Sequence, residues 1–338
     1  MTEKVVRQHV VPKLLLKGFV SNTNPDVLWL YDKTRDNVVQ ASPADAAVVK
    51  HFYDVPGVDP LYVEKLQGRI ESSAGVALAK LRSRQALTLL ERVDWALFVA
   101  YLSVRTPVSV EGQLDTALTG FKYMMQWLAS DPHMFEVTVR RMQDEGRLAP
   151  GGDIEEARRQ VLAWDIDFKP PRHEFLVGLL EMAAGFAKWM ASMKWTILVA
   201  PRESHFVCSD NPVYVEDPHR DPVRTGGAGL ASSGTVELTC PLAAGVAMLG
   251  TWHRGVRLQY LAVYPPVVRE VNKRTVLAAQ RFVFAPRQDD GIARLVRKYS
   301  NIQPTATIET VAKDRSGFLM KLSHQTHPVK SIVEMLSS

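Results

Sequence analysis

A histidine near the start of the chain and an aspartate far along it are the residues best suited to acid–base chemistry. His9 directly precedes an apolar segment that must pack, so its imidazole should lie at the edge of the core. There it could serve as acid, base or metal ligand near neutral pH. Asp210 lies in the motif Ser-Asp-Asn-Pro at 209–212, where a carboxylate could act as a general base or hold a cation. The structural alternatives are a histidine bonded to backbone and a turn formed by Asp and Asn before proline.

Four further polar residues complete the candidate site. Glu71 is the third catalytic candidate, because apolar residues flank it on a helix that the spacing predicts from 61 to 82. Arg105 ends an apolar helix in the motif Arg-Thr-Pro, and a guanidinium there could clamp a phosphate or a carboxylate. Asn211 could donate to an oxyanion or a phosphate, and Gln8 joins it as a substrate-binding candidate. The alternative role for Glu71 and Arg105 is a buried ion pair.

One pair of acids is the candidate metal site. If a metal is bound, Asp210 and Glu71 would be its ligands, with Mg²⁺ as the expected ion. The two cysteines form no CxxC pair, which excludes a zinc knuckle and a redox dithiol. His324 and His327 have ligand types at a helical spacing, but two histidines alone are weak evidence for a metal. The chain has no phosphate-binding glycine loop, no GxSxG elbow and no HExxH motif.

The elements that must position these residues change in type along the chain. A hairpin is expected near the N-terminus, around 27–39, and helical spacing dominates from 61 to 194. Short strands separated by turn residues then follow, from about 195 to 285, with a helix at 267–279 among them. This order lacks the regular βαβ alternation and predicts an α+β fold with a mainly antiparallel C-terminal sheet, flanking helices, and an N-terminal hairpin that could join it.

Length and composition fit one large globular domain. The chain has 338 residues, 46% of them hydrophobic and 23% charged. We expect a single domain over 1–338, with a helical insertion at about 61–194, a strand-rich part at about 195–285 and a basic C-terminal part at 266–338. The N-terminus has no signal-peptide pattern and no apolar stretch is long enough for a membrane span, so we expect a cytoplasmic protein without membrane contact.

The excess positive charge lies in the last quarter of the sequence. From residue 266 onward there are 12 Lys and Arg against 6 Asp and Glu, a net charge of +6. The remaining 29 basic and 30 acidic residues give −1. A basic face in this part could contact nucleic acid, and the alternative is an ordinary solvated helix surface.

Three local patterns, taken as a set, resemble a known family. They are HxxPxxxLxxF starting at His9, Arg-Thr-Pro starting at Arg105, and the Ser-Asp-Asn-Pro motif. This order is similar to the microbial family catalogued as DUF4238, a domain of unknown function, and the resemblance covers about residues 9–301. Many members carry glutamine three residues before the Arg-Thr-Pro arginine, where this chain has Leu102. The resemblance implies fold and organisation but no reaction.

Two functions therefore compete. In the first, His9, Glu71, Arg105, Asp210 and Asn211 converge on a cleft, and the protein is a hydrolase of a phosphodiester or similar anionic substrate. The basic C-terminal part would help to hold nucleic acid. In the second, the same polar residues join the helices to the sheet, and the protein is a non-catalytic module that binds nucleic acid or a partner protein. Sequence reasoning favours the enzyme, because this set of side chains is unusual for a purely structural role.

Overall fold

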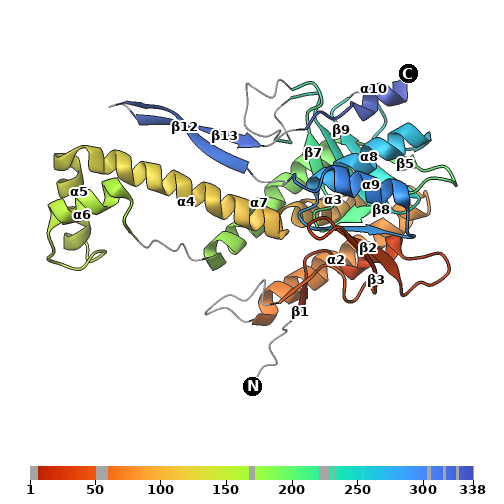
Figure 1. The fold of residues 1–338 in the computed structure, drawn as a ribbon, viewed down its shortest axis with the longest axis horizontal. Coiled ribbons are helices and arrows are strands. Elements are labelled where there is room, and N and C mark those ends of the chain that lie inside the picture. The colour runs from red at the N-terminus through yellow and green to blue at the C-terminus, as the bar shows by residue number, and fades with distance from the viewer. Residues whose placement is uncertain are drawn as a thin grey trace. The chain divides into compact units, whose positions relative to one another are not determined.

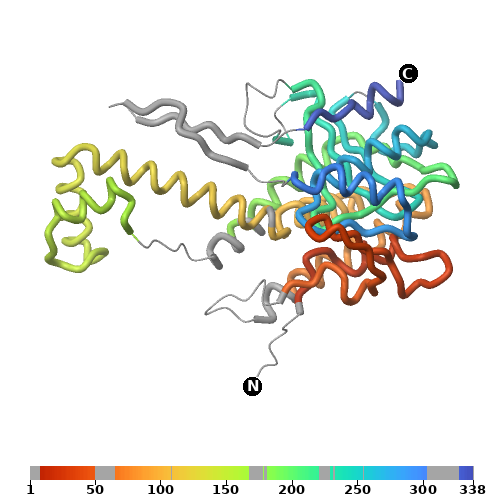
Figure 2. The backbone as a smooth tube through the Cα atoms, viewed as in Figure 1, coloured from red at the N-terminus to blue at the C-terminus, as the bar shows by residue number. Residues whose placement is uncertain are grey.

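The computed structural model describes residues 7–50, 60–166, 172–220, 229–230, 233–253, 255–302, 306–314, 317–324 and 327–337. Figure 2 traces the backbone with a colour gradient from the N-terminus to the C-terminus. The chain divides into two compact units. The first comprises 1–110, 172–305 and 324–338, and the second comprises 111–171 and 306–323. No helix among the described residues is long and apolar enough to span a bilayer.

A five-stranded mixed sheet forms the centre of the first unit (Figure 1). Its strand order is β10-β5-β9-β8-β7, with one parallel pair, β10 with β5, and antiparallel pairs elsewhere. Side chains alternate across a strand, so Ile197 and Leu198 of β5 belong to clusters on opposite faces. The bounds are β5 Lys194–Val199, β7 Tyr214–Glu216, β8 Glu237–Ala243, β9 Val246–Thr251 and β10 Leu258–Ala262.

A second, four-stranded antiparallel sheet has the order β3-β2-β11-β6. The expected N-terminal hairpin is present as β2 and β3, and it does join a later strand, because β2 pairs with β11. The bounds are β2 Leu28–Asp32, β3 Asn37–Ala41, β6 Cys208–Ser209 and β11 Phe282–Ala285. The short strand β6 carries the first residue of the Ser-Asp-Asn-Pro motif, so that motif leaves the sheet beside β11.

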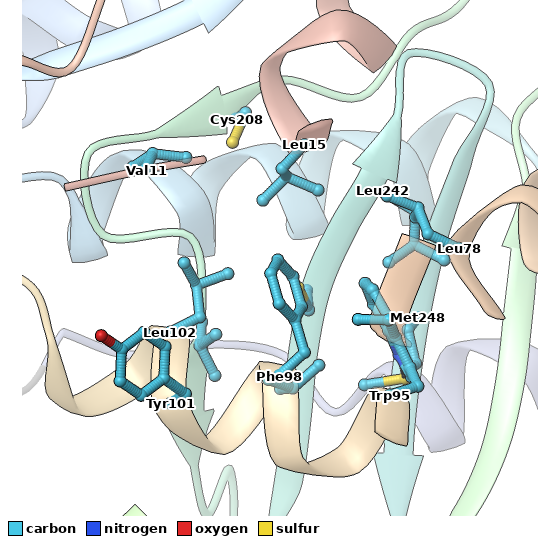
Figure 3. Packing of buried hydrophobic residues seen from close by; sticks show 14 of the residues in the cluster. Val11, Leu15, Leu78, Trp95, Phe98, Tyr101, Leu102, Cys208, Leu242 and Met248 are labelled. Atoms are coloured by element: carbon cyan, nitrogen blue, oxygen red, sulfur yellow. Dashed lines mark hydrogen bonds between the residues drawn. The ribbon is translucent and has the colours of Figure 1, made fainter. Parts of the chain in front are cut away.

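Three helices cover one face of the central sheet and form the main core (Figure 3). Apolar positions at helical spacing put Trp95, Phe98 and Leu102 of α3 into this core beside Met248 of β9. The Trp95 indole N–H lies 3.3 Å from the Met248 sulfur. A Thr88–Glu91 capping box starts α3, and its C-cap is Arg105. The bounds are α2 Pro60–Arg82, α3 Leu89–Val104 and α7 Arg172–Ser192.

The N-terminal segment packs tightly against α2 and β8. Arg82 donates to the carbonyls of Leu14, Leu15 and Leu242, which joins this segment to both elements. Gly18 lies beneath that guanidinium, where a Cβ would come within 2.5 Å of Arg82 Nη2. The bounds are β1 Arg7–His9, paired with β4 Val48–Lys50, then α1 Lys13–Leu16 and the 3₁₀ helix η1 Lys17–Phe19.

Helices near the C-terminus cover the other faces of the two sheets. Val267, Val268 and Val271 of α8 pack with Ile332 of α10 against the central sheet. The end of α8 and α9 pack on the four-stranded sheet through Val276, Ile292 and their neighbours. The bounds are α8 Pro265–Ala278, α9 Asp290–Lys298 and α10 Ile332–Ser337.

The second unit contains helices with their own small cluster, including Phe135 and Val161, and a two-stranded hairpin. Asp131 caps α5 with proline following it, and Asp153 caps α6. The bounds are α4 Pro107–Ser130, which begins in the first unit, α5 Pro132–Asp144, α6 Ile154–Ala163, β12 Ala306–Asp314 and β13 Gly317–His324.

The α+β prediction is confirmed, including the central helices and the helix-flanked C-terminal sheet. The central helical region comprises α2 to α7, and residues 111–171 within it belong to the second unit. One strand pair, β10 with β5, is parallel within the mainly antiparallel sheet. The single-domain organisation stays a prediction.

Candidate functional site

The N-terminal motif and the Arg-Thr-Pro motif meet at a buried arginine. Arg105, only 2% exposed, donates to the backbone carbonyl of His9 and, at 3.1 Å, to the Glu71 carboxylate. Its guanidinium also lies 5.1 Å from the centre of the Tyr101 ring. Arg105 caps the end of α3, so this cluster joins β1, α2 and α3. Such contacts suit a structural cation, because a buried guanidinium needs acceptors around it.

The His9 ring is held at the edge of the fold. Its Nε2 lies 3.1 Å from the carbonyl oxygen of Ala44, to which it donates. Partial burial lowers the pKa of His9, and the nearby Lys13 lowers it further, while the carbonyls of Ala44 and Pro43 oppose the shift. The imidazole is therefore neutral at pH 7 and has no carboxylate among these named neighbours. That arrangement fixes the ring to the segment 42–47.

Two other residues of this motif region are buried. Gln8, a predicted substrate-binding residue, is 4% exposed and lies on β1, paired with Val49. Leu102, three residues before Arg105, is fully buried in the main core. Position 102 therefore faces packed apolar side chains rather than solvent.

The aspartate of the second motif is bound by backbone amides. Asp210 accepts hydrogen bonds from the N–H groups of Gln280, Arg281 and Phe282, at 2.8 to 2.9 Å. Its own N–H donates to the carbonyl of Phe282. Burial raises the pKa of Asp210, and these three amides and Lys33 oppose that shift. The carboxylate thus closes the turn between α8 and β11.

The rest of the Ser-Asp-Asn-Pro motif serves the same turn. The Asn211 side-chain amide donates to the carbonyl of Ala278, the last residue of α8, at 3.1 Å. The Ser209 hydroxyl donates to the Asn211 carbonyl at 2.8 Å. Helix ends leave carbonyls without partners, and Asn211 supplies one of the missing donors. These are the contacts of the turn alternative recognised from the sequence.

A lysine that sequence reasoning did not select completes this cluster. Lys33 is 2% exposed, and its ammonium donates to the carbonyls of Val276 and Ala279 at the end of α8. Burial lowers the pKa of Lys33 to about 8, and Asp210 opposes the shift. A cation is favourable at a helix C-terminus. The sequence around Lys33, which follows strand β2, did not indicate this contact, because the partner helix lies more than 240 residues further along the chain.

The predicted site residues form two groups. His9, Glu71 and Arg105 belong to the cluster of β1, α2 and α3, whereas Asp210 and Asn211 belong to the turn between α8 and β11. The hydrogen bonds described above do not join one group to the other. Within the residues that the structure describes, no group of three or more His, Cys, Asp and Glu is placed to hold a metal ion. The Mg²⁺ assignment to Asp210 and Glu71 stays a prediction.

Three lysines gather near the C-terminal segment. Burial lowers the pKa of Lys273. The charges of Lys298 and Lys330 lower this pKa further, and the charge of Glu270 opposes the shift. Lys298 and Lys330 are exposed, and they lie at the end of α9 and just before α10. We call Lys273, Lys298 and Lys330 the basic cluster. The charge excess of the last quarter indicated this region, but not which lysines come together.

A pocket of about 230 Å³ lies beside this cluster. The end of β7 and the residues after it line one side, and residues before α10 line the other; the lining residues are Glu216, Asp217, Pro218, Arg220, His327, Pro328 and Val329. The Lys273 ammonium donates to the carbonyl of Pro328, so the basic cluster and the pocket share a wall. The Tyr299 ring lies edge-on to His327, with centroids 6.1 Å apart.

A buried charge network holds the C-terminal wall in place. Arg274 donates to Glu237 at 2.6 Å, and both side chains are at most 1% exposed. Glu237 also accepts from the Ser331 hydroxyl and from the N–H groups of Ile332 and Val333. Glu270 accepts from the Lys330 N–H at 2.9 Å. These bonds attach residues 330–333 to α8 and β8.

Comparison with known proteins gives one match. A family model described as "Protein of unknown function (DUF4238)" matches residues 7–289. No curated protein and no solved structure matches the chain. The matched range includes all three motifs and ends before α9, so it leaves out the segment with Lys298 and Lys330. Because the match covers most of the sequence and both polar clusters, the chain belongs to the DUF4238 family of proteins of unknown function.

Proposed function

We propose that this protein is a non-catalytic module that binds nucleic acid through the basic cluster. The observation that carries the proposal is that the Lys273 ammonium binds the Pro328 carbonyl at the pocket wall, in a region that also holds the exposed Lys298 and Lys330. Crowded like charges cost folding free energy, and a polyanion that neutralises them recovers it. The rings of Tyr299 and His327 lie next to this charge, as is common where unpaired bases are bound.

The contacts of the motif residues favour binding over hydrolysis. Asp210 accepts from three amides, Asn211 donates to the end of α8, and Arg105 donates to Glu71 and to the backbone of His9. Groups engaged in this way support the fold, because replacing their partners by a substrate would leave buried polar atoms unbonded. The hydrolase, with or without Mg²⁺, stays a prediction that rests on residue types alone.

The proposal is tested by fluorescence anisotropy with labelled single-stranded and double-stranded oligonucleotides at several salt concentrations. Log K should fall linearly with log salt, because bound lysines release counterions. Changing both Lys298 and Lys330 to Ala should reduce the slope by about 0.7 per lysine for a single strand. Lys188→Ala, an exposed lysine on α7, is the matched control and should leave the slope unchanged.

Two results would contradict this function. One is the absence of salt-dependent binding to any oligonucleotide at low ionic strength. The other is hydrolysis of the oligonucleotide in the presence of Mg²⁺ that His9→Ala abolishes without lowering the melting temperature, which would instead support the enzyme.

A further inference from the structure

The pocket beside the basic cluster has two walls that the fold holds firmly. On one side, the Asp217 carboxylate accepts from the hydroxyls of Ser233 and Thr235, at 2.5 and 2.8 Å, and from the N–H of His219. On the other side, Lys273 binds the carbonyl of Pro328. Asp217 thus already accepts three donors, and the pocket's second carboxylate, that of Glu216, accepts fewer.

Glu216 retains acceptor capacity. Its Oε1 accepts from the Asp217 N–H at 3.1 Å, and its Oε2 lies 3.5 Å from the Tyr214 hydroxyl. A carboxylate offers about four lone-pair positions, so at least two are open to further donors. Burial raises the pKa of Glu216, while Arg220 and Arg274 oppose the shift. A ligand that presents N–H donors would satisfy this half-buried group.

The opposite wall offers a polar atom in need of a partner. The Nε2 of His327 is buried and makes no hydrogen bond. Pro218, Pro328 and Val329 supply apolar surface around it. The pocket thus combines flat apolar contacts, a carboxylate acceptor and an unsatisfied imidazole nitrogen, which suits a planar heteroaromatic ring with polar edges.

We propose that this pocket takes the unpaired base of a single-stranded nucleic acid and that guanine is the preferred base. The inference rests on the proposed function, because the basic cluster at the shared wall would hold the phosphates on either side of that base. Guanine carries adjacent N1–H and N2–H donors, which match the two open positions of the Glu216 carboxylate. The other edge of the guanine ring carries the acceptor atoms N7 and O6.

The size of the pocket agrees with one base. A cavity of about 150 Å³ is enough to hold a benzene ring. The pocket volume of about 230 Å³ leaves room for a two-ring purine, and it is too small for a stacked pair of bases. A base stacked inside a duplex could not enter this pocket, so the ligand must be single-stranded at that base.

The test compares nine-residue oligonucleotides, in RNA and DNA form, that consist of U or T with a single central G, A, C or U/T. The central G should bind roughly 10-fold more tightly than the others, within the range of one bidentate base contact. Glu216→Gln should remove that preference, so that the strands with a central G, A, C or U/T bind with equal affinity. Glu181→Gln, on the exposed surface of α7, is the matched control and should keep the preference.

Free nucleotides give a measurement that needs no variant. GMP should displace the G-containing strand at concentrations where AMP does not. If Glu216→Gln lowers the melting temperature, the base preference of the unaltered protein and this competition still decide the matter.

The outcomes separate the two proposals. Equal binding of all four strands, or a preference that Glu216→Gln leaves intact, overturns the guanine pocket while the binding function stands. Preference for another base also overturns the guanine assignment. Failure of every strand to bind at low salt overturns the binding function and the pocket together.

Discussion

Arg274 and Glu237 form a fully buried ion pair, 2.6 Å apart, that joins α8 to β8. The same glutamate accepts two amides and a hydroxyl from 331–333, so one carboxylate holds both the pair and the C-terminal segment. The family match ends at residue 289, and this pair is therefore where the family's shared fold meets the segment beyond the match. The pocket wall at 327–329 depends on it.

Breaking this pair should be costly. Glu237→Gln removes the nearer of the two carboxylates that face the buried Arg274 cation, leaving Glu270 at 3.8 Å, and we expect the free energy of unfolding to fall by about 3 kcal/mol. Urea denaturation followed by circular dichroism measures the loss. Glu136→Gln, in an exposed pair with Arg140 on α5, is the control and should change stability by less than about 1 kcal/mol. Equal effects of the two variants would contradict the structural role of Glu237.

The amide-bound aspartate gives a second prediction. Asp210→Asn replaces a charged acceptor of three N–H groups by an amide with one oxygen, so we expect a loss of about 2 to 4 kcal/mol. Nucleic-acid affinity should not change, because Asp210 serves the turn between α8 and β11. Asp26→Asn, at an exposed turn, is the control and should be nearly neutral. A stable variant that loses an activity would instead support the catalytic reading of Asp210.

The lysine at the end of α8 predicts a specific pH dependence. The pKa of Lys33 is lowered to about 8 from an ordinary value of 10.5, so the unfolded chain binds more protons between these values. The titration of Lys33 therefore makes the free energy of unfolding rise as the pH increases from about 8 to 10.5. This contribution of Lys33 to stability is lost as the pH falls through about 8. Lys33→Met removes the titration. The unfolding free energy of the unaltered protein minus that of Lys33→Met should increase from pH 7 to 10.5. A difference that does not change with pH would refute the assignment.

A glycine contact gives a fourth prediction with an internal control. A Cβ at Gly18 would lie 2.7 Å from the Leu242 carbonyl and 2.5 Å from Arg82 Nη2, so Gly18→Ala should destabilise by about 1 to 3 kcal/mol. Gly68 is exposed on α2 with nothing within 4 Å of its Cβ position, and Gly68→Ala should stabilise by about 0.5 to 1 kcal/mol. Thermal melting distinguishes the opposite signs. Two shifts of the same sign would show that α2 does not pack on η1 as described.

The candidate catalytic residue Glu71, in the cluster of β1, α2 and α3, gives the last prediction. Glu71→Gln keeps an acceptor for Arg105 but removes its charge, so stability should fall by about 1 to 3 kcal/mol. Oligonucleotide binding should be unaffected, because this cluster joins β1, α2 and α3 and carries none of the basic cluster. Anisotropy with the same strands checks this, and a weakened affinity at unchanged stability would place Glu71 in the binding machinery.

Periodicity and composition indicated the central helices and the strand-rich part that follows them. The apolar helix that ends at Arg105 was indicated by its helical spacing, because that spacing is a local property of the chain. The proline-flanked N-cap at Asp131 was equally readable. The three motifs also identified the family, since their order along the chain is itself sequence information.

Only the tertiary structure decided what the polar residues contact. Hydrogen bonds of Asp210 to residues 280–282, and of Lys33 to the end of α8, join positions separated by 70 to 246 residues. No local pattern encodes such pairings, because they depend on which strand and helix ends the fold brings together. The same holds for the basic cluster and its pocket, where charge counting found the region and packing chose the three lysines.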